Sequence, residues 1–266
     1  MSISSAVVRP CSRHWLLAVL FATGLSAADT QLRLGPDEFI VGVELVSSQL
    51  EHSATRVDEA VIHPVVRGRF FDIGIEVDGW LAAGDDESYS GAEFAELTQA
   101  GLRLDYLIET SGLFQVLPFF EHQNYVGIPH PTDDEVFWLG ADFWYLTPLE
   151  GLEVGANSAV DLGGDHGWYL SLGSRQFLQI DPLDLRSWQT VTFGTTDYHE
   201  STSGADVSGI NAIEIGAEGL LPLPWEDLWA SLRAEVHVWV QGADRRAVAD
   251  DAEFVFALGV EYRMPR

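Results

Sequence analysis

Apolar and polar side chains alternate along most of this chain. Segment 72–81 shows the pattern clearly, because Ile73, Ile75 and Val77 share one side while Glu76 and Asp78 point to the other. Successive side chains of a β-strand point to opposite faces, whereas a helix repeats its apolar positions every three to four residues. The segment is therefore predicted to be a strand with one apolar and one acidic face.

The same alternation recurs to the end of the chain and predicts about twelve strands. They run over 38–49, 59–69, 71–83, 94–109, 113–125, 134–147, 151–162, 165–178, 184–197, 207–220, 227–241 and 252–263. Pro64 and Pro118 lie inside the second and fifth of these, where proline removes a donor from the strand ladder, so a count of ten is also open. The pattern predicts an all-β fold, an antiparallel transmembrane β-barrel.

The connections between these strands alternate in length. Those after even-numbered strands are short, such as Phe70 alone or 110–112, whereas most of those after odd-numbered strands are longer and acidic, such as 84–93 and 242–251. Short turns at one rim and long loops at the other are typical of outer-membrane barrels. The tight connection at 163–164 is the exception.

Alternation alone does not separate a membrane barrel from a soluble one, because a soluble barrel turns its apolar side inward. Segment 228–240 favours the membrane, since its seven apolar positions oppose Arg233, Glu235 and His237. Aromatic residues also gather near strand ends, as they do at membrane interfaces. These are Trp80, Trp138, Trp144, Tyr145, Trp168, Trp225 and Trp229.

The first 28 residues are typical of an export signal. A basic start with Arg9 and Arg13 precedes a short apolar run from Trp15 to Leu25, and small residues at 26–28 form a cleavage site. We expect a signal peptide at 1–28, a short periplasmic lead-in at 29–37 and an outer-membrane β-barrel at 38–266. The expected location is the outer membrane of a Gram-negative-type bacterium, after cleavage.

Charge and cysteine content exclude several functions. The net charge is −27 and all 14 basic residues are Arg, so nucleic-acid binding is disfavoured, because phosphate contacts need a basic surface. The single cysteine, Cys11, lies in the predicted signal, which leaves the exported chain without thiol chemistry. We expect no cofactor and no metal site: the histidines lack the spacing of metal ligands.

Three segments carry a resemblance to a known family. They are EFIVGVELVSS at 38–48, VIHPVV at 61–66 and FVFALGVEY at 254–262. With the layout of the whole chain, they resemble the TorF-type porin family of outer-membrane β-barrels. The resemblance implies insertion by the outer-membrane assembly machinery through the C-terminal strand, and passive transport. In this chain Tyr262 is followed by four further residues where the family usually ends on an aromatic.

The polar faces of the strands would line the lumen, and carboxylates there favour cations. The expected lumen-lining residues are Glu44, Asp72, Glu76, Asp78, Arg103, Asp105, Asp142, Glu153, Asp161, Arg233, Glu235, His237, Glu261 and Arg263. The alternative is that the same acids and arginines form a packed ion-pair network, because a twelve-stranded barrel is narrow. An open pore and a packed lumen therefore both stay open.

Acidic clusters in the predicted loops offer oxygen ligands for Ca²⁺ or Mg²⁺, although none matches an EF-hand loop and solvated loops are the simpler explanation. The possible ion-binding loop residues are Asp85, Asp86, Glu87, Asp133, Asp134, Glu135, Asp250 and Asp251. A further alternative is an outer-membrane lipase, because His199 and Ser201 lie in one predicted external loop.

The sequence as a whole predicts a porin-like, non-enzymatic channel with an acidic, cation-favouring lumen. Its partners would be outer-membrane lipid, the assembly machinery, and small solutes or cations. The alternatives are a structural or ion- or partner-binding barrel with a packed lumen, and an outer-membrane lipase.

Overall fold

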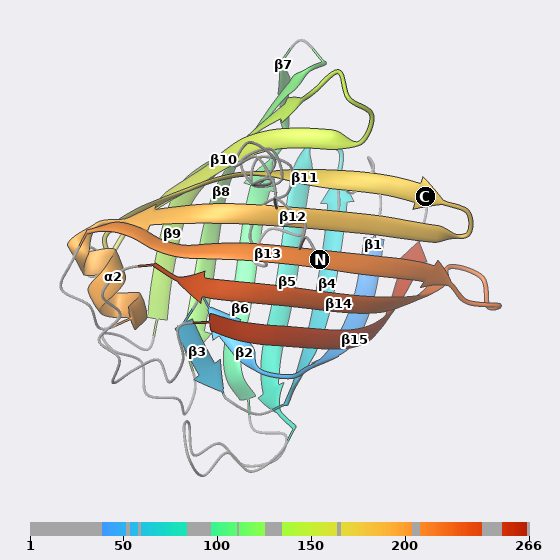
Figure 1. Cartoon of the computed structure of the whole chain (residues 1–266), viewed down its shortest axis with the longest axis horizontal. Coiled ribbons are helices and arrows are strands. Elements are labelled where there is room, and N and C mark those ends of the chain that lie inside the picture. The colour runs from blue at the N-terminus through green and yellow to red at the C-terminus, as the bar shows by residue number, and fades with distance from the viewer. Residues whose placement is uncertain are drawn as a thin grey trace, which may run out of the picture.

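The strands close into an antiparallel β-barrel (Figure 1). The computed structural model describes residues 39–51, 54–57, 60–83, 97–110, 112–125, 135–163, 166–203, 208–240 and 252–264. The predicted signal peptide at 1–28 and lead-in at 29–37 lie outside these ranges. No helix within the described ranges is long and apolar enough to cross a membrane.

Twelve positions around the barrel wall follow the chain order, each strand pairing with its neighbours in sequence. The strands are β1 (Phe39–Val46), β4 (Val61–Phe70), β5 (Ile73–Ala82), β6 (Leu97–Tyr106) with its continuation β7 (Ile108–Thr110), β8 (Phe114–Tyr125), β9 (Glu135–Leu146), β10 (Leu152–Asp161), β11 (Trp168–Ile180), β12 (Leu183–Gly194), β13 (Gly209–Pro222), β14 (Leu228–Trp239) and β15 (Ala252–Met264). Pairing of β1 with β15 closes the wall. The predicted fold class and strand number are confirmed.

Two elements lie outside this wall. A short hairpin, β2 (Gln49–Glu51) with β3 (Ala54–Val57), follows β1, and a helix, α2 (Thr196–Ser203), follows β12. Figure 1 shows both near the end of the barrel opposite the short turns. The sequence predicted neither of them.

Both internal prolines sit where the ladder is interrupted. Pro64 pairs with Val43 of β1, but the β4–β5 pairing skips 63–64 and resumes in the same register. On one side of β8, Pro118 pairs with Ala141 of β9. On the other side of β8, Pro118 faces the break between β6 and β7. Because proline has no N–H to donate, each break falls where its missing donor would have bonded. The barrel thus keeps its strand number without a bulge at either proline.

The two faces of the wall differ in exposure and chemistry. On β14, Leu232 is 64 % exposed while the adjacent Arg233 is 9 % exposed, and on β15 Phe254, Phe256 and Leu258 are all exposed. The outer face is therefore apolar and open, and the inner face is polar and buried. This inverts the arrangement of a soluble barrel and matches a wall that faces lipid.

Inward-facing glycines let large side chains lie flat against the next strand. Gly216 of β13 lies between Trp188 and Glu235 in the register, and a Cβ at 216 would come within 2.3 Å of the Trp188 indole. Gly74 of β5 likewise lies between Arg69 and Asp105. A β-carbon there would meet Asp105 Oδ2 at 2.3 Å. These glycines leave room for contacts that cross a whole strand.

Candidate functional site

The inner face of the barrel carries most of the predicted lumen residues. Their side chains are buried or partly buried, in contrast to the exposed apolar residues beside them. They are Glu44, Glu76, Asp78, Arg103, Asp105, Asp142, Glu153, Asp161, Arg233, Glu235, His237, Glu261 and Arg263.

Asp72 does not belong to this set. The strand starts at Ile73, two residues later than predicted, and Asp72 is exposed in the two-residue turn that it forms with Phe71. Phe71 has a φ of 55°, in the left-handed region that such a tight turn uses. The prediction that Asp72 lines the lumen is corrected accordingly; its carbonyl oxygen accepts from Arg69 instead.

Some inner arginines pair with the carboxylate directly opposite on the neighbouring strand. Arg67 faces Glu76 at 2.8 Å, Arg175 faces Glu153 at 2.8 Å, and Arg186 faces Glu218 at 3.1 Å. Arg263 pairs within its own strand with Glu261.

Other inner arginines reach across an entire strand. Arg69 of β4 binds Asp105 of β6 at 2.5 Å over β5, and Arg233 of β14 binds Glu44 of β1 at 2.9 Å over β15. Arg103 of β6 binds Asp142 of β9 at 2.5 Å over β8. The guanidinium of Arg103 also lies 3.8 Å from the centre of the Phe119 ring. These three strand-skipping ion pairs join strands that share no backbone hydrogen bonds.

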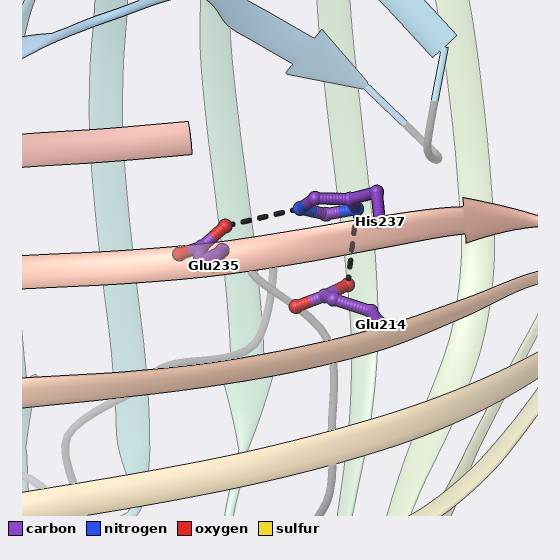
Figure 2. A group of neighbouring side chains, drawn as sticks. All are labelled: Glu214, Glu235 and His237. Atoms are coloured by element: carbon purple, nitrogen blue, oxygen red, sulfur yellow. Dashed lines mark hydrogen bonds and ion pairs between the residues drawn. The ribbon is translucent and has the colours of Figure 1, made fainter. Parts of the chain in front are cut away.

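One group of inner side chains converges between β13 and β14 (Figure 2). Glu214, Glu235 and His237 each offer a ligand atom, and these atoms lie within 4.8 Å of one another. His237 Nε2 is 3.1 Å from Glu235 Oε2, and His237 Nδ1 is 3.8 Å from Glu214 Oε2. All three side chains are buried.

A second histidine lies between two acids on β1 and β5. His63 Nε2 is 3.3 Å from Asp78 Oδ2, and Nδ1 is 3.6 Å from Glu44 Oε2. Its ring stacks on Trp80 with centroids 4.0 Å apart. The Glu44 oxygen that faces this ring is the one bound by Arg233.

Sequence reasoning missed several of these residues. His63, Glu121 and Glu218 were not among the predicted lumen residues, although Glu121 lies 3.4 Å from Arg103. Glu218 and Glu214 are an even number of residues apart on one strand, so their side chains point to the same face. Counting in steps of two from Glu214 would therefore have found Glu218. His63 has the same strand parity as the inner Arg67 and Arg69 of β4, so the same counting would have found it.

Asp161 has a local role at the end of β10. Its carboxylate accepts from the backbone N–H groups of Gly163 at 3.0 Å and His166 at 3.1 Å, and it lies 3.1 Å from His166 Nδ1. The carboxylate therefore holds the backbone at Gly163 and at His166, beside the end of β10.

Helix α2 bears on the lipase alternative. His199 is fully buried, with Nε2 3.2 Å from the carbonyl oxygen of Gly209, and Tyr198 packs on Trp138 and Tyr169. The side chain at position 201 lies outside the described part of the chain, so the lipase alternative stays a prediction.

The predicted ion-binding loop residues lie outside the described residues, except for Glu135. Glu135 opens β9 and accepts from the Asn124 amide at 3.1 Å. The loop prediction stays a prediction.

Comparison with known proteins found likeness at the level of structure. No protein-family model matches this chain, and no curated protein matches it. The NanC porin matches with a TM-score of 0.53 and 11 % identity, over 84 % of this chain and 100 % of that chain. An outer-membrane channel from Pseudomonas putida F1 matches with a TM-score of 0.51 and 10 % identity, over 90 % and 100 %. At such identities the likeness shows a shared porin-like barrel fold, and the TorF-type resemblance stays a prediction.

Proposed function

We propose that this protein is a porin-like, non-enzymatic channel of the outer membrane that passes small solutes and favours cations. One observation carries the proposal: an apolar, exposed outer face encloses a polar inner face in a closed barrel. A wall of this kind suits a lipid environment outside and a polar path inside. The barrel likeness to solved channels supports the same function.

The preference for cations is inferred from the charges on the inner face. Each of the seven inner arginines in the described part of the chain has a carboxylate partner, and further carboxylates, including Asp78, face that lumen beside those pairs. Surplus carboxylates along a narrow path lower the energy of a passing cation and raise that of an anion.

A packed, structural barrel is the rival function, and the inner ion pairs favour it. Arg67, Arg186, Arg233 and Glu218 line a small internal cavity of about 30 Å³. Space of that size holds one or two water molecules rather than a hydrated solute. In this alternative the loops, not the lumen, would bind ions or a partner.

Planar-bilayer recording under a salt gradient tests the proposal. We expect discrete conductance steps and a cation-selective reversal potential for the purified chain. The variant Glu76→Gln/Asp78→Asn should move the reversal potential toward zero, while Glu135→Gln at the strand start should leave it near the wild-type value. A folded, membrane-inserted barrel without conductance would overturn the channel, and an anion-selective one would overturn the cation preference.

A further inference from the structure

We propose that Glu214 and His237 hold a divalent transition-metal ion, of the Zn²⁺ class, in the inner wall of the barrel. The proposal rests on the geometry of this cluster and stands whether or not the barrel conducts. Figure 2 shows the two side chains facing each other from β13 and β14, with Glu235 on the far side of the imidazole ring.

Glu235 sets the orientation of the His237 imidazole. His237 Nε2 lies 3.1 Å from Glu235 Oε2, a normal hydrogen-bond distance, so Nε2 carries the proton and donates it to this carboxylate. Nδ1 then presents its lone pair toward Glu214. A carboxylate that binds the far nitrogen of a metal-ligating histidine is the usual way to fix its tautomer and raise its basicity.

A gap separates Nδ1 of His237 from the Glu214 carboxylate. His237 is 2 % exposed, and among the residues that the structure describes its Nδ1 has no hydrogen-bond partner. The nearest acid oxygen, Glu214 Oε2, is 3.8 Å away, which is too long for a hydrogen bond. Two ligands of one tetrahedral Zn²⁺, each at about 2.1 Å, lie roughly 3.4 Å apart. The observed separation is close to that of two ligands sharing an ion.

The Glu214 carboxylate is also held in place. Trp188 Nε1 donates to Glu214 Oε1 at 2.8 Å, which leaves Oε2 turned toward His237. Trp188 can take this position because Gly216 leaves room for its indole. Both ligands are thus oriented by neighbours before an ion arrives, which lowers the ordering cost of binding.

The electrostatics favour a cation at this position. Glu253 of β15 is the register partner of His237, on the side opposite Glu214, and adds a third nearby carboxylate to Glu214 and Glu235. Imidazole with carboxylate suits Zn²⁺ and neighbouring transition metals, whereas Ca²⁺ and Mg²⁺ prefer oxygen ligands alone. The chemistry therefore selects a borderline ion over an alkaline-earth ion.

The cluster around His63 provides an internal comparison. There the imidazole also lies between two acids, but the Glu44 oxygen that faces Nδ1 binds the Arg233 guanidinium at 2.9 Å. A resident cation already neutralises that oxygen. His63 is therefore a matched control: a buried inner histidine with two acidic neighbours that is not expected to bind metal.

The test is calorimetric titration of ZnCl₂ into the full chain, expressed with its export segment, purified in detergent and stripped with chelator. We expect one tight equivalent for wild type and for His63→Gln, and loss of that equivalent in His237→Gln and in Glu214→Gln. Glu235→Gln should weaken the affinity at least about tenfold, since loss of an orienting partner has that effect. Heat-modifiable electrophoretic mobility shows which variants fold. If His237→Gln does not fold, Glu214→Gln provides the test of the site.

Two results would overturn the proposal. Absence of a tight equivalent in folded wild type would mean that a proton alone bridges His237 and Glu214. Retention of that equivalent in folded His237→Gln or Glu214→Gln would place zinc on other acidic groups, such as those of the loops.

Discussion

Gly216 shows how one missing side chain shapes the inner face. It lies between Trp188 and Glu235 in the register, and the Trp188 indole occupies the space that a Cβ at 216 would need. Trp188 is 1 % exposed and donates to Glu214, so its position is fixed by both packing and hydrogen bonding. A glycine in a strand costs conformational entropy, and here the packed indole offsets it.

Gly216→Ala should therefore lower the free energy of unfolding by about 1–3 kcal/mol, the usual cost of overpacking a filled site. Gly219→Ala on the same strand is the matched control, because its Cβ would meet the Leu183 and Leu185 side chains at an ordinary 3.6 Å. Denaturant unfolding in detergent, followed by tryptophan fluorescence, measures both. Equal stability of the two variants would contradict the close contact.

His199 supplies a pH dependence outside the membrane-spanning strands. Burial lowers its pKa from the ordinary value of 6.5, and the hydrogen bond to the Gly209 carbonyl opposes part of that shift. Below a pH of about 6.5, His199 binds a proton more readily in the unfolded than in the folded segment. The contribution of neutral His199 to the stability of the folded segment is therefore present above this pH and is lost as the pH falls.

We expect the amides of α2 to lose hydrogen-exchange protection between pH 7.5 and pH 5.5, after correction for intrinsic exchange rates. His199→Gln should flatten this dependence. Protection that falls equally with pH in His199→Gln would assign the effect to another group.

At the scale of elements, the strand-skipping ion pairs add contacts that backbone pairing does not provide. Arg103 joins β6 to β9 by binding Asp142, which is 2 % exposed and also accepts from Asn157. Removing one partner of a buried pair leaves the other charge without compensation, which is more costly than removing both.

Arg103→Met should destabilise the barrel by roughly 3–5 kcal/mol, and Arg103→Met/Asp142→Asn by distinctly less. Arg263→Met, at the end of β15 and more exposed, should cost at most about 1 kcal/mol. The double-mutant cycle, measured by denaturant unfolding, gives the coupling directly. Additive single effects would mean that the two charges do not stabilise each other.

Period-2 alternation predicted the strands well, because one buried and one exposed face fix the parity of each residue. It placed Glu235 and His237 on the polar face of 228–240, where the structure has them. It did not predict which acid each arginine binds, because that depends on register and on reach across a strand. Arg69 and Asp105 are far apart in sequence and meet only because Gly74 lies between them.

The missed elements have a different cause. The β2–β3 hairpin has strands of three and four residues, too short for alternation to be read. Helix α2 is short and polar, and it is held by the burial of Tyr198 and His199 rather than by its own pattern. Asp72 was misplaced by a single residue at a strand boundary, which is the least predictable part of an element.

At the scale of the whole molecule, the central feature is which face of the barrel wall meets lipid. Exposed Leu232, Phe254 and Leu258 on the outer face, with Arg233 and Glu235 inside, require an apolar environment around the barrel. The proposed channel function and the distribution of ion pairs both depend on this orientation. A barrel with its apolar side turned inward would contradict all of them together.

The most direct measurement is a spin-label scan along β14 in lipid bilayers. Single cysteines at 230–236, in a chain with Cys11 removed by Cys11→Ser, are labelled and their accessibility to oxygen and to a water-soluble nickel complex is compared. We expect a period of two, with oxygen accessibility highest at positions 230, 232, 234 and 236 and low values at 231, 233 and 235. High nickel accessibility at 232 and 234, with no contact with lipid, would contradict it.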